Sequence, residues 1–236
     1  MANLKIALLF QDGNFVGREY FHALEDAGVP LTFVAAAGRM APESIAIERE
    51  RTGGRWNPPP IPEERMDARF SGLADSKLWS TLRERGIDVA IQGGLGILKP
   101  DMLAVPKLGF VNVHPGRLPA YRGRNCPEWA ILEGDDVYAT AHMIDAGIDT
   151  GPVICEGRYD IRPGWTYADF RAGLYAHCAR VLIEALKKLA GATSETLSKY
   201  VTAQDEAKAR YREGMTAGEL ERTKVTLVRR TGAKPG

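Results

Sequence analysis

The sequence predicts an α/β fold in which helices cover both faces of a mostly parallel, twisted sheet. Short apolar runs typical of strands alternate along the chain with segments of helical periodicity. The runs are almost continuously apolar, as expected of parallel strands that are buried on both faces. The regular alternation ends near residue 190. We therefore expect one main domain over residues 1–190 and a short C-terminal extension over residues 191–236.

The first elements predict one β-α-β unit with a right-handed connection. Residues 5–10 form a short apolar run that ends at Gln-Asp-Gly, which indicates a buried strand. Residues 15–27 have helical periodicity, and Gly28 follows them as the residue that ends the helix. A second strand is expected over residues 31–36, and then a helix over residues 42–50 with a proline in its first turn.

A long irregular segment follows over residues 51–72. It contains Thr-Gly-Gly-Arg-Trp-Asn-Pro-Pro-Pro-Ile-Pro, a composition that excludes a helix or a central strand. Loops of this length are often functional, and a plain surface connection is the equal alternative.

Beyond this segment the alternation resumes. Helices are expected at residues 76–85, with Ser76 as the cap, from Pro100 over a short stretch, and at residues 127–133 and 166–189. Strands are expected at residues 87–92, 109–114, 138–144 and 153–161. In the extension we expect a helix at residues 205–213, a strand at residues 224–228 and a loose tail over residues 229–236.

The composition narrows the classes of function. The chain has 31 Lys and Arg against 30 Asp and Glu, and a net charge of +1 offers no general attraction for nucleic acid. No run approaches the roughly 18 apolar residues of a membrane span, and the first run is too short for a signal peptide. The three cysteines contain no CxxC pair and the four histidines no HxxH pair, so we expect no disulfide framework and no metal. These features predict a cytoplasmic protein.

The candidate chemistry begins at Asn112-Val113-His114, at the end of an apolar strand. Because side chains alternate along a strand, Asn112 and His114 share one face. In open α/β sheets ligands bind at the carboxyl ends of the strands. An amide N–H and an imidazole at that edge would stabilise a developing oxyanion in acyl transfer. For this motif alone, a satisfied polar pair at the strand end is the alternative.

The surrounding residues extend the motif. They read Asn112-Val-His-Pro-Gly-Arg-Leu-Pro-Ala-Tyr-Arg-Gly123, Pro127-Glu-Trp-Ala-Ile131, Thr140-Ala-His142 and Asp149-Thr-Gly-Pro-Val-Ile154. This series resembles the folate-dependent formyltransferase family, and within it most the sugar N-formyltransferases. The resemblance is close over residues 87–160 and implies a Rossmann-like formyltransferase fold, with residues 1–190 as the catalytic domain. Gly116-Arg117 stands where the family pattern has Ser-Leu, and Arg117 adds charge near the mouth of the site.

The resemblance also implies roles for individual residues. The catalytic Asn, His and Asp would be Asn112, His114 and Asp149, with His142 supporting the Asp. Two segments would bind N10-formyltetrahydrofolate as the co-substrate: Leu95, Gly96, Ile97 and Leu98, and Ile144, Asp145, Ala146 and Gly147. We expect Asn112 and His114 to stabilise the negative oxygen, and Asp149 to take the proton of the amine and hold His114 in its donor state. No metal is implied.

The acceptor is predicted to be a small primary amine. Its candidate contacts are Gln11, Asp12 and Asn14, after the first strand, and Tyr121 and Arg122, in the loop over residues 114–124, called the site loop below. The preferred acceptor is a nucleotide-linked amino sugar. A hydroxyornithine-type or other small amine, glycinamide ribonucleotide, and hydrolysis of formyltetrahydrofolate are the alternatives.

The sequence disfavours two functions, formylation of glycinamide ribonucleotide and formylation of methionyl-tRNA. The acidic residue in the Gln11–Phe15 loop is electrostatically unfavourable for the phosphate of glycinamide ribonucleotide. The residues after Leu189 are too few for the further domain of a methionyl-tRNA formyltransferase. The expected partners are therefore the amine and folate, without nucleic acid or membrane, and a homodimer is left open.

Overall fold

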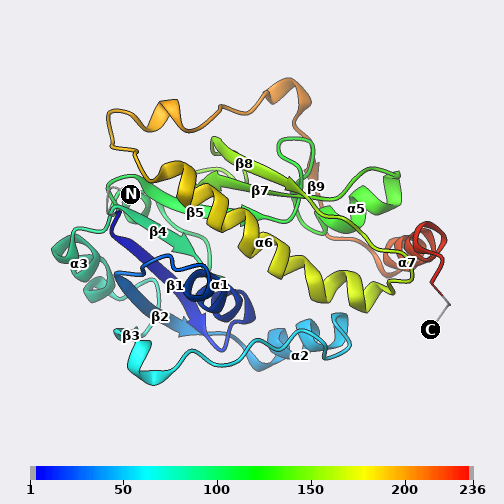
Figure 1. Cartoon of the computed structure of the whole chain (residues 1–236), viewed down its shortest axis with the longest axis horizontal. Coiled ribbons are helices and arrows are strands. Elements are labelled where there is room, and N and C mark those ends of the chain that lie inside the picture. Colours follow the sequence, from blue (N-terminus) through cyan, green and yellow to red (C-terminus); the bar gives the residue numbers. More distant parts are fainter. Residues whose placement is uncertain (1–3, 234–236) are drawn as a thin grey trace.

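The computed structural model describes residues 4–233 and is built on a seven-stranded sheet in the order β3-β2-β1-β4-β5-β7-β8 (Figure 1). The strands are β1 (Ile6–Asp12), β2 (Phe33–Arg39), β3 (Ala68–Phe70), β4 (Val89–Gln92), β5 (Gly109–His114), β7 (Tyr138–Met143) and β8 (Val153–Arg158). The four pairings from β3 to β5 are parallel, whereas β5–β7 and β7–β8 are antiparallel. The predicted mostly parallel sheet is confirmed.

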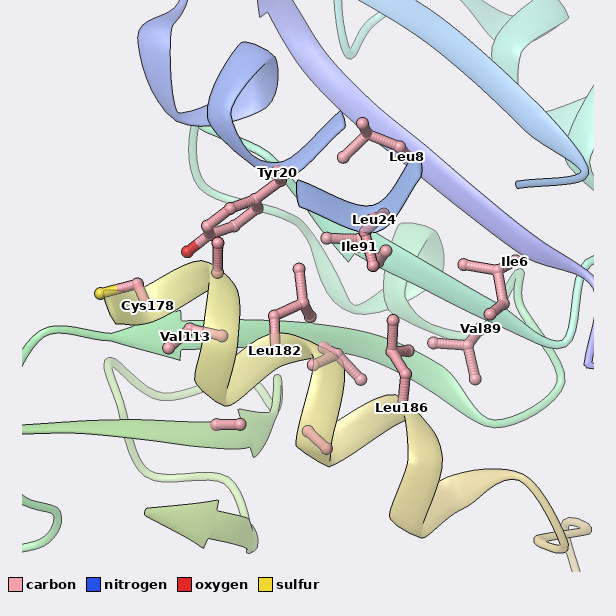
Figure 2. Close-up of a cluster of buried hydrophobic side chains, with 14 of the residues drawn as sticks. Ile6, Leu8, Tyr20, Leu24, Val89, Ile91, Val113, Cys178, Leu182 and Leu186 are labelled. Atoms are coloured by element: carbon pink, nitrogen blue, oxygen red, sulfur yellow. The ribbon is translucent and has the colours of Figure 1, made fainter. Parts of the chain in front are cut away.

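Helices cover both faces of this sheet, as the sequence predicts. They are α1 (Phe15–Asp26), α2 (Pro42–Arg51), α3 (Ser76–Arg85), α4 (Pro100–Leu103), α5 (Cys126–Glu133), α6 (Tyr167–Leu189) and α7 (Ala217–Thr231). Figure 2 shows Tyr20 and Leu24 of α1 beside Leu182 and Leu186 of α6, packed on one face of the strands. Leu78 and Leu82 of α3 pack on the other face. Within residues 4–233, no helix is both long and apolar enough to cross a membrane.

Strand β1 shows why its sequence is continuously apolar. Ile6, Leu8 and Phe10 belong to the cluster under α1 and α6, whereas Ala7 and Leu9 belong to the cluster under α3 and α4. Since alternate residues point to opposite faces and both faces are covered, each position is buried. The paired β1 and β4 then end at the same edge of the sheet, where the candidate site lies.

The long segment between α2 and α3 is more ordered than the sequence predicts. It contains a 3₁₀ turn, η1 (Glu63–Arg65), and ends in β3, which pairs with β2 at the edge of the sheet. Its Trp56 ring stacks on Tyr175 of α6 with centroids 4.4 Å apart, and Trp56 donates a hydrogen bond to Glu19 of α1 at 2.8 Å. The three residues of β3 are too few to show the alternation of a strand, so the sequence predicts a loop there.

The cap of α3 is also corrected. Asp75, not Ser76, is the N-cap, because its carboxylate accepts a hydrogen bond from the Lys77 amide at 3.1 Å. Ser76 is the first helical residue.

The C-terminal extension differs most from the prediction. The prediction of a helix at residues 205–213 is wrong. These residues contain a 3₁₀ turn, η3 (Glu206–Lys208), and then β9 (Tyr211–Arg212). Strand β9 pairs in parallel with β6 (Arg122–Gly123). A further 3₁₀ turn, η2 (Leu197–Lys199), precedes them.

The prediction of a strand at residues 224–228 is wrong as well, because these residues lie inside α7. Thr216 and Glu219 form a capping box that starts the helix, and Thr223, Leu227 and Thr231 recur on its buried face every four residues. The β-branched residues of this segment hide that period in the sequence. The helix continues to Thr231, so the loose tail expected over residues 229–236 is wrong for residues 229–231, and residues 234–236 lie outside the described residues.

Candidate active site

The candidate site forms where β5 pairs with β7. In this antiparallel ladder Asn112 lies opposite His142 and His114 lies opposite Thr140. Asn112 and His114 are two residues apart and therefore point to the same side of the sheet, as the sequence predicts. The ladder brings His142 to the same place from a strand 30 residues away in sequence.

His142 orients the Asn112 amide. The Nδ1–H of His142 donates to the Met143 carbonyl at 2.9 Å, which leaves Nε2 as an acceptor for Asn112 Nδ2 at 3.2 Å. Burial, and to a smaller extent the nearby His114, lower the pKa of His142 to about 4. His142 is therefore neutral at pH 7, and its 3.8 Å approach to Asp149 Oδ1 is not an ion pair. The contact with His142 Nε2 therefore fixes the orientation of the Asn112 side-chain amide.

His114 lies between two acceptors. Its Nε2 lies 2.7 Å from the Tyr121 carbonyl oxygen and its Nδ1 lies 3.3 Å from Asp149 Oδ2. Because a carbonyl oxygen only accepts, Nε2 is the protonated nitrogen that donates to Tyr121, and Nδ1 faces the Asp149 carboxylate. Asp149 Oδ2 also accepts a hydrogen bond from the Gly123 amide at 2.9 Å. The structure thus brings the three predicted catalytic residues and His142 into one network.

The C-terminal extension holds Asp149 in place. Asp149 has a φ of +56°, in the left-handed region that non-glycine residues seldom adopt. Gln204 Nε2 donates to the carbonyls of Asp149 at 2.9 Å and Gly151 at 2.7 Å. Gln204 Oε1 accepts from Arg122 Nη2 at 2.8 Å. Sequence reasoning missed Gln204, because nothing in the local pattern of an irregular segment links it to Asp149.

Gly116 permits the position of the His114 ring. A Cβ atom at Gly116 would lie 2.6 Å from His114 Nε2 and 2.8 Å from both the Cys126 Cβ and the Tyr121 carbonyl oxygen. Arg117, by contrast, forms an ion pair with Glu156 at 3.0 Å on β8. Of the two residues that differ from the family pattern, Gly116 therefore affects the position of the catalytic side chains more than Arg117 does.

The two predicted folate segments pack against the same buried cluster. Leu98 belongs to the buried cluster under α3 and α4, and Leu95 and Ile144 pack against that same cluster. Ile97 is 87% exposed and Ile148, next to the second segment, is 54% exposed. Exposed apolar side chains next to a buried apolar cluster are typical of a ligand-binding surface, and they suit a ligand with a flat ring.

The backbone of both segments is held by side chains. Gln92 Oε1 accepts from the Gly94 amide at 3.0 Å, and its Nε2 donates to the Leu95 carbonyl at 3.3 Å. In the second segment Asp145 Oδ1 accepts from the Gly147 amide at 3.1 Å and from Thr150 Oγ1. Gly96, Asp145, Ala146 and Gly147 are exposed, so each segment is accessible to a ligand.

The residues predicted to contact the acceptor form hydrogen bonds or ion pairs with other residues of the chain. Asn14 is buried as the N-cap of α1 and donates to the Gly94 carbonyl at 3.0 Å. Asp12 pairs with Arg39 at 3.0 Å, and the Gln11 amide donates to Gly94 at 3.4 Å.

Tyr121 and Arg122 are also buried. The Tyr121 hydroxyl lies within hydrogen-bond distance of Glu133 and Asp135, and Arg122 pairs with Glu206 at 2.6 Å in addition to Gln204. The role of all five residues toward an acceptor stays a prediction.

A cavity of about 220 Å³ lies beside His114 and was not predicted. It is lined by residues of α2, the site loop, α5 and α6, among them Arg51, Arg124, Glu128 and Arg171. Within residues 4–233, His, Cys, Asp and Glu side chains do not gather in threes that could hold a metal ion.

Comparison with protein families finds that the family described as "Formyl transferase" matches residues 20–186. A methionyl-tRNA formyltransferase of Deinococcus radiodurans is 35% identical over 167 residues, which make up 66% of this chain and 50% of that protein. One of Acetivibrio thermocellus is 29% identical over 190 residues, or 76% of this chain and 61% of that protein. The chain spans about half the length of the curated relatives it matches.

Comparison with solved structures confirms the predicted fold. A phosphoribosylglycinamide formyltransferase from Streptococcus pneumoniae superposes with a TM-score of 0.58 and 26% identity, over 79% of this chain and 99% of that one. A sugar N-formyltransferase from a Shewanella species superposes with a TM-score of 0.60 over 96% of this chain and 89% of that one. Its identity of 12% shows a shared fold alone.

Proposed function

Because the chain belongs to the formyl transferase family, we propose that it transfers a formyl group from N10-formyltetrahydrofolate to a primary amine. The observation that carries the proposal is the network of Asn112, His114 and Asp149. Asn112 presents an oriented amide, His114 lies against the Asp149 carboxylate, and Asp149 is 12% exposed in its side chain. This set provides an oxyanion donor, a positive charge and a proton acceptor at one edge of the sheet.

Each residue has a distinct task in the reaction. When bound, the folate supplies an activated formyl carbon. Attack of a neutral amine on that carbon places negative charge on the formyl oxygen and positive charge on the nitrogen. Asn112 donates its second amide N–H to the oxygen, and the His114 imidazolium stabilises the same charge electrostatically. Asp149 accepts the proton that the amine nitrogen loses. The bond from the formyl carbon to N10 then breaks, and tetrahydrofolate leaves with a proton on N10.

We infer that His114 stabilises the oxygen mainly through its charge. Both of its ring nitrogens face acceptors within the chain, at Tyr121 and Asp149. Its contribution is therefore the positive charge that it carries when protonated, whereas the hydrogen bond to the oxygen comes from Asn112.

The folate would be held by the exposed surface of residues 95–98 and 144–147. The side chain of Leu98 is buried, whereas those of Ile97 and Ile148 are exposed and available to the ring. The amide and carbonyl groups of these loops are the polar contacts for the ring.

A nucleotide-linked amino sugar is the acceptor that we favour, in agreement with the sequence pattern. Glycinamide ribonucleotide is the second candidate, since the chain is 26% identical to the phosphoribosylglycinamide formyltransferase from Streptococcus pneumoniae and covers 99% of that chain. A hydroxyornithine-type amine and plain hydrolysis are the remaining small-molecule alternatives. The curated relatives named methionyl-tRNA formyltransferase add aminoacyl-tRNA to the candidates to be tested.

A single assay tests the activity. The purified chain is incubated with N10-formyltetrahydrofolate and each candidate acceptor, and both the released tetrahydrofolate and the formylated product are measured. We expect product with an amine acceptor, and its loss in Asn112→Ala. Release of formate without any formylated amine would show a hydrolase instead, and absence of both products would contradict the proposal.

A further inference from the structure

A small cavity brings a buried carboxylate close to His114. The cavity has a volume of about 220 Å³, and both His114 and Glu128 line it. This volume lies below the roughly 300–1,000 Å³ of sites that bind whole small molecules, so the cavity is suited to one small group of a ligand. It also reaches Gly123, whose amide donates to Asp149. A group that enters the cavity therefore lies close to His114 and to the loop that holds Asp149.

Glu128 and Arg171 form a buried ion pair in which each partner has one polar atom without a contact. The side chain of Glu128 is fully buried, that of Arg171 is 5% exposed, and Oε1 of Glu128 lies 3.2 Å from Nη1 of Arg171. Oε1 also accepts from the Tyr167 hydroxyl at 2.9 Å. Among residues 4–233, no group donates to Glu128 Oε2 and none accepts from Arg171 Nε. Buried polar atoms without partners are unfavourable, so this pair is suited to a ligand that offers both a donor and an acceptor.

Arg171 also approaches a second carboxylate, that of Glu48. Arg171 Nη2 lies 3.5 Å from Glu48 Oε2, and Arg51 Nη1 lies 3.3 Å from Glu48 Oε1. The first half of α6, which carries Arg171, lies between α2 with Glu48 and α5 with Glu128 (Figure 1). Arg171 therefore keeps a counter-ion if Glu128 becomes neutral. The positive charge that is then in excess is that of Arg51, whose side chain is 37% exposed to water.

The reaction needs an amine that has lost a proton before it attacks. A primary alkylamine such as the lysine side chain has a pKa of about 10.4, so at pH 7 nearly all of it is the ammonium ion. An ammonium nitrogen has no lone pair with which to attack the formyl carbon. Asp149 is assigned to the proton that the nitrogen loses after the attack. The earlier proton has no acceptor in that assignment.

We propose that Glu128 is the acceptor of this first proton. The ammonium ion donates to Glu128 Oε2 and passes one proton to it, which gives the carboxylic acid and a neutral amine. The lone pair of the amine then forms the bond to the formyl carbon, and Asp149 takes the second proton. After the product has left, Glu128 loses its proton to water. The inference rests on the proposed function and adds a catalytic residue to it.

The surroundings of Glu128 favour this proton transfer. Arg51 and Arg124 line the cavity together with Arg171, and nearby positive charges lower the pKa of a bound amine. A buried ammonium–carboxylate pair also contains two desolvated charges, which the transfer removes. Burial by itself would lower the pKa of Arg171, but Glu128 raises it above its ordinary value, so Arg171 stays protonated. Its Nε–H can then donate to an oxygen atom of the acceptor.

Steady-state kinetics of the full chain at pH 7 and pH 9 test this role. The substrate is the acceptor that gives most product in the formylation assay. Below the pKa of the amine, its neutral fraction rises about tenfold per pH unit, so an acceptor for the first proton matters less at pH 9. We expect Glu128→Gln to lower kcat/KM for the acceptor about 10²-fold at pH 7 and about tenfold or less at pH 9, each relative to the parent chain at the same pH.

Other groups around Glu128 do not disturb this comparison. Burial raises the pKa of the nearby phenol and thiol groups, which belong to Tyr167, Tyr175 and Cys126. The arginines that line the cavity stay charged at both pH values. Any titration of His114, Asp149 or Glu48 is common to the parent chain and the Glu128 variant, so it cancels in the ratio of their kcat/KM values.

Two further variants separate proton transfer from structure. Glu48→Gln removes the other carboxylate beside Arg171 but lies outside the cavity lining, so any loss of kcat/KM should be equal at pH 7 and pH 9. Glu128→Gln combined with Arg171→Gln removes both charges of the buried pair and leaves neither unpaired, so it avoids the main cause of misfolding in the single variant. The double variant should show the same pH-dependent loss. Urea unfolding of each variant checks that it is folded.

The outcomes distinguish this inference from the proposed function. A loss that shrinks at pH 9 in both Glu128 variants but not in Glu48→Gln supports Glu128 as the proton acceptor. An equal loss at both pH values in the Glu128 variants, or kcat/KM near that of the parent chain at pH 7, overturns the inference and leaves the proposed function standing. If the parent chain forms no formylated product with any candidate acceptor, the proposed function falls and the inference falls with it.

Discussion

Asn112 and His142 face each other across the β5–β7 ladder, with Nδ2 of Asn112 3.2 Å from Nε2 of His142. His142 donates its other ring proton to the Met143 carbonyl, so its tautomer is set by the backbone. The direction of the Asn112 amide follows from that tautomer, and the amide is the group that we expect to bind the reacting oxygen.

The first prediction is that His142 acts through Asn112. His142→Leu removes the acceptor that orients the amide, so kcat is expected to fall about 10–10²-fold, less than the about 10²–10³-fold expected for Asn112→Ala. The double variant should be little worse than Asn112→Ala alone, because the two residues contribute one interaction. Steady-state kinetics of the three variants check this, with His22→Leu on the surface of α1 as the control. Effects that multiply would show that His142 acts independently of Asn112.

The second prediction concerns stability at low pH. The pKa of His142 is lowered to about 4 in the folded chain, against about 6.5 when the chain is unfolded. Between these values the unfolded state binds the extra proton, so the free energy of unfolding falls as the pH falls, by up to about 1.4 kcal/mol per pH unit. Burial also lowers the pKa of His177, which adds a loss in the same direction.

Urea unfolding at pH 7 and pH 5 separates the two histidines. His177 remains in the His142→Leu variant, so its contribution cancels in the comparison. We expect the variant to lose less stability than the parent chain between the two pH values. Equal losses would mean that His142 does not titrate as proposed.

The third prediction concerns Gly116. Gly116→Ser places a Cβ atom 2.6 Å from the present position of His114 Nε2, so the ring must move. We expect kcat to fall about tenfold or more, whereas folate binding, measured by titration, changes little. Gly218→Ser is the matched control, because a Cβ atom there meets no atom within 4 Å. Full activity in Gly116→Ser would show that the His114 position is not needed.

The fourth prediction assigns a positioning role to Gln204. Gln204→Ala removes two hydrogen bonds to the carbonyls that flank the Asp149 turn, and we expect kcat to fall about tenfold with an unfolding free energy lower by about 1–2 kcal/mol. Glu206→Ala removes the other partner of Arg122 without touching Asp149, so kcat should stay near that of the parent chain. Equal kcat values in both variants would reduce Gln204 to a structural residue.

The sequence predicts what depends on local periodicity. The shared face of Asn112 and His114 follows from the period of a strand, and β1 is recognisable because both of its faces are buried. The end of α1 follows from Gly28, whose φ of +66° suits glycine. These features need no knowledge of the rest of the chain.

The remainder depends on contacts between distant segments. The link of Gln204 to Asp149 joins residues 55 positions apart, and the crowding at Gly116 exists only once Cys126 and Tyr121 are packed around it. The same holds for α7, because residues 224–228 read locally as a strand although Leu227 is buried on one face of a helix. No local pattern encodes these relationships, so they appear only in the folded structure.

The central claim is that His114 and Asp149 work as one unit in formyl transfer. The most direct test is kcat for His114→Ala, Asp149→Asn and the double variant, with folate affinity measured to confirm an intact fold. Asp149→Asn removes the proton acceptor and is expected to cost about 10²–10⁴-fold. We predict that the double variant is little slower than the slower single variant. Single effects that multiply in the double variant, or an Asp149→Asn variant near full activity, would contradict the account.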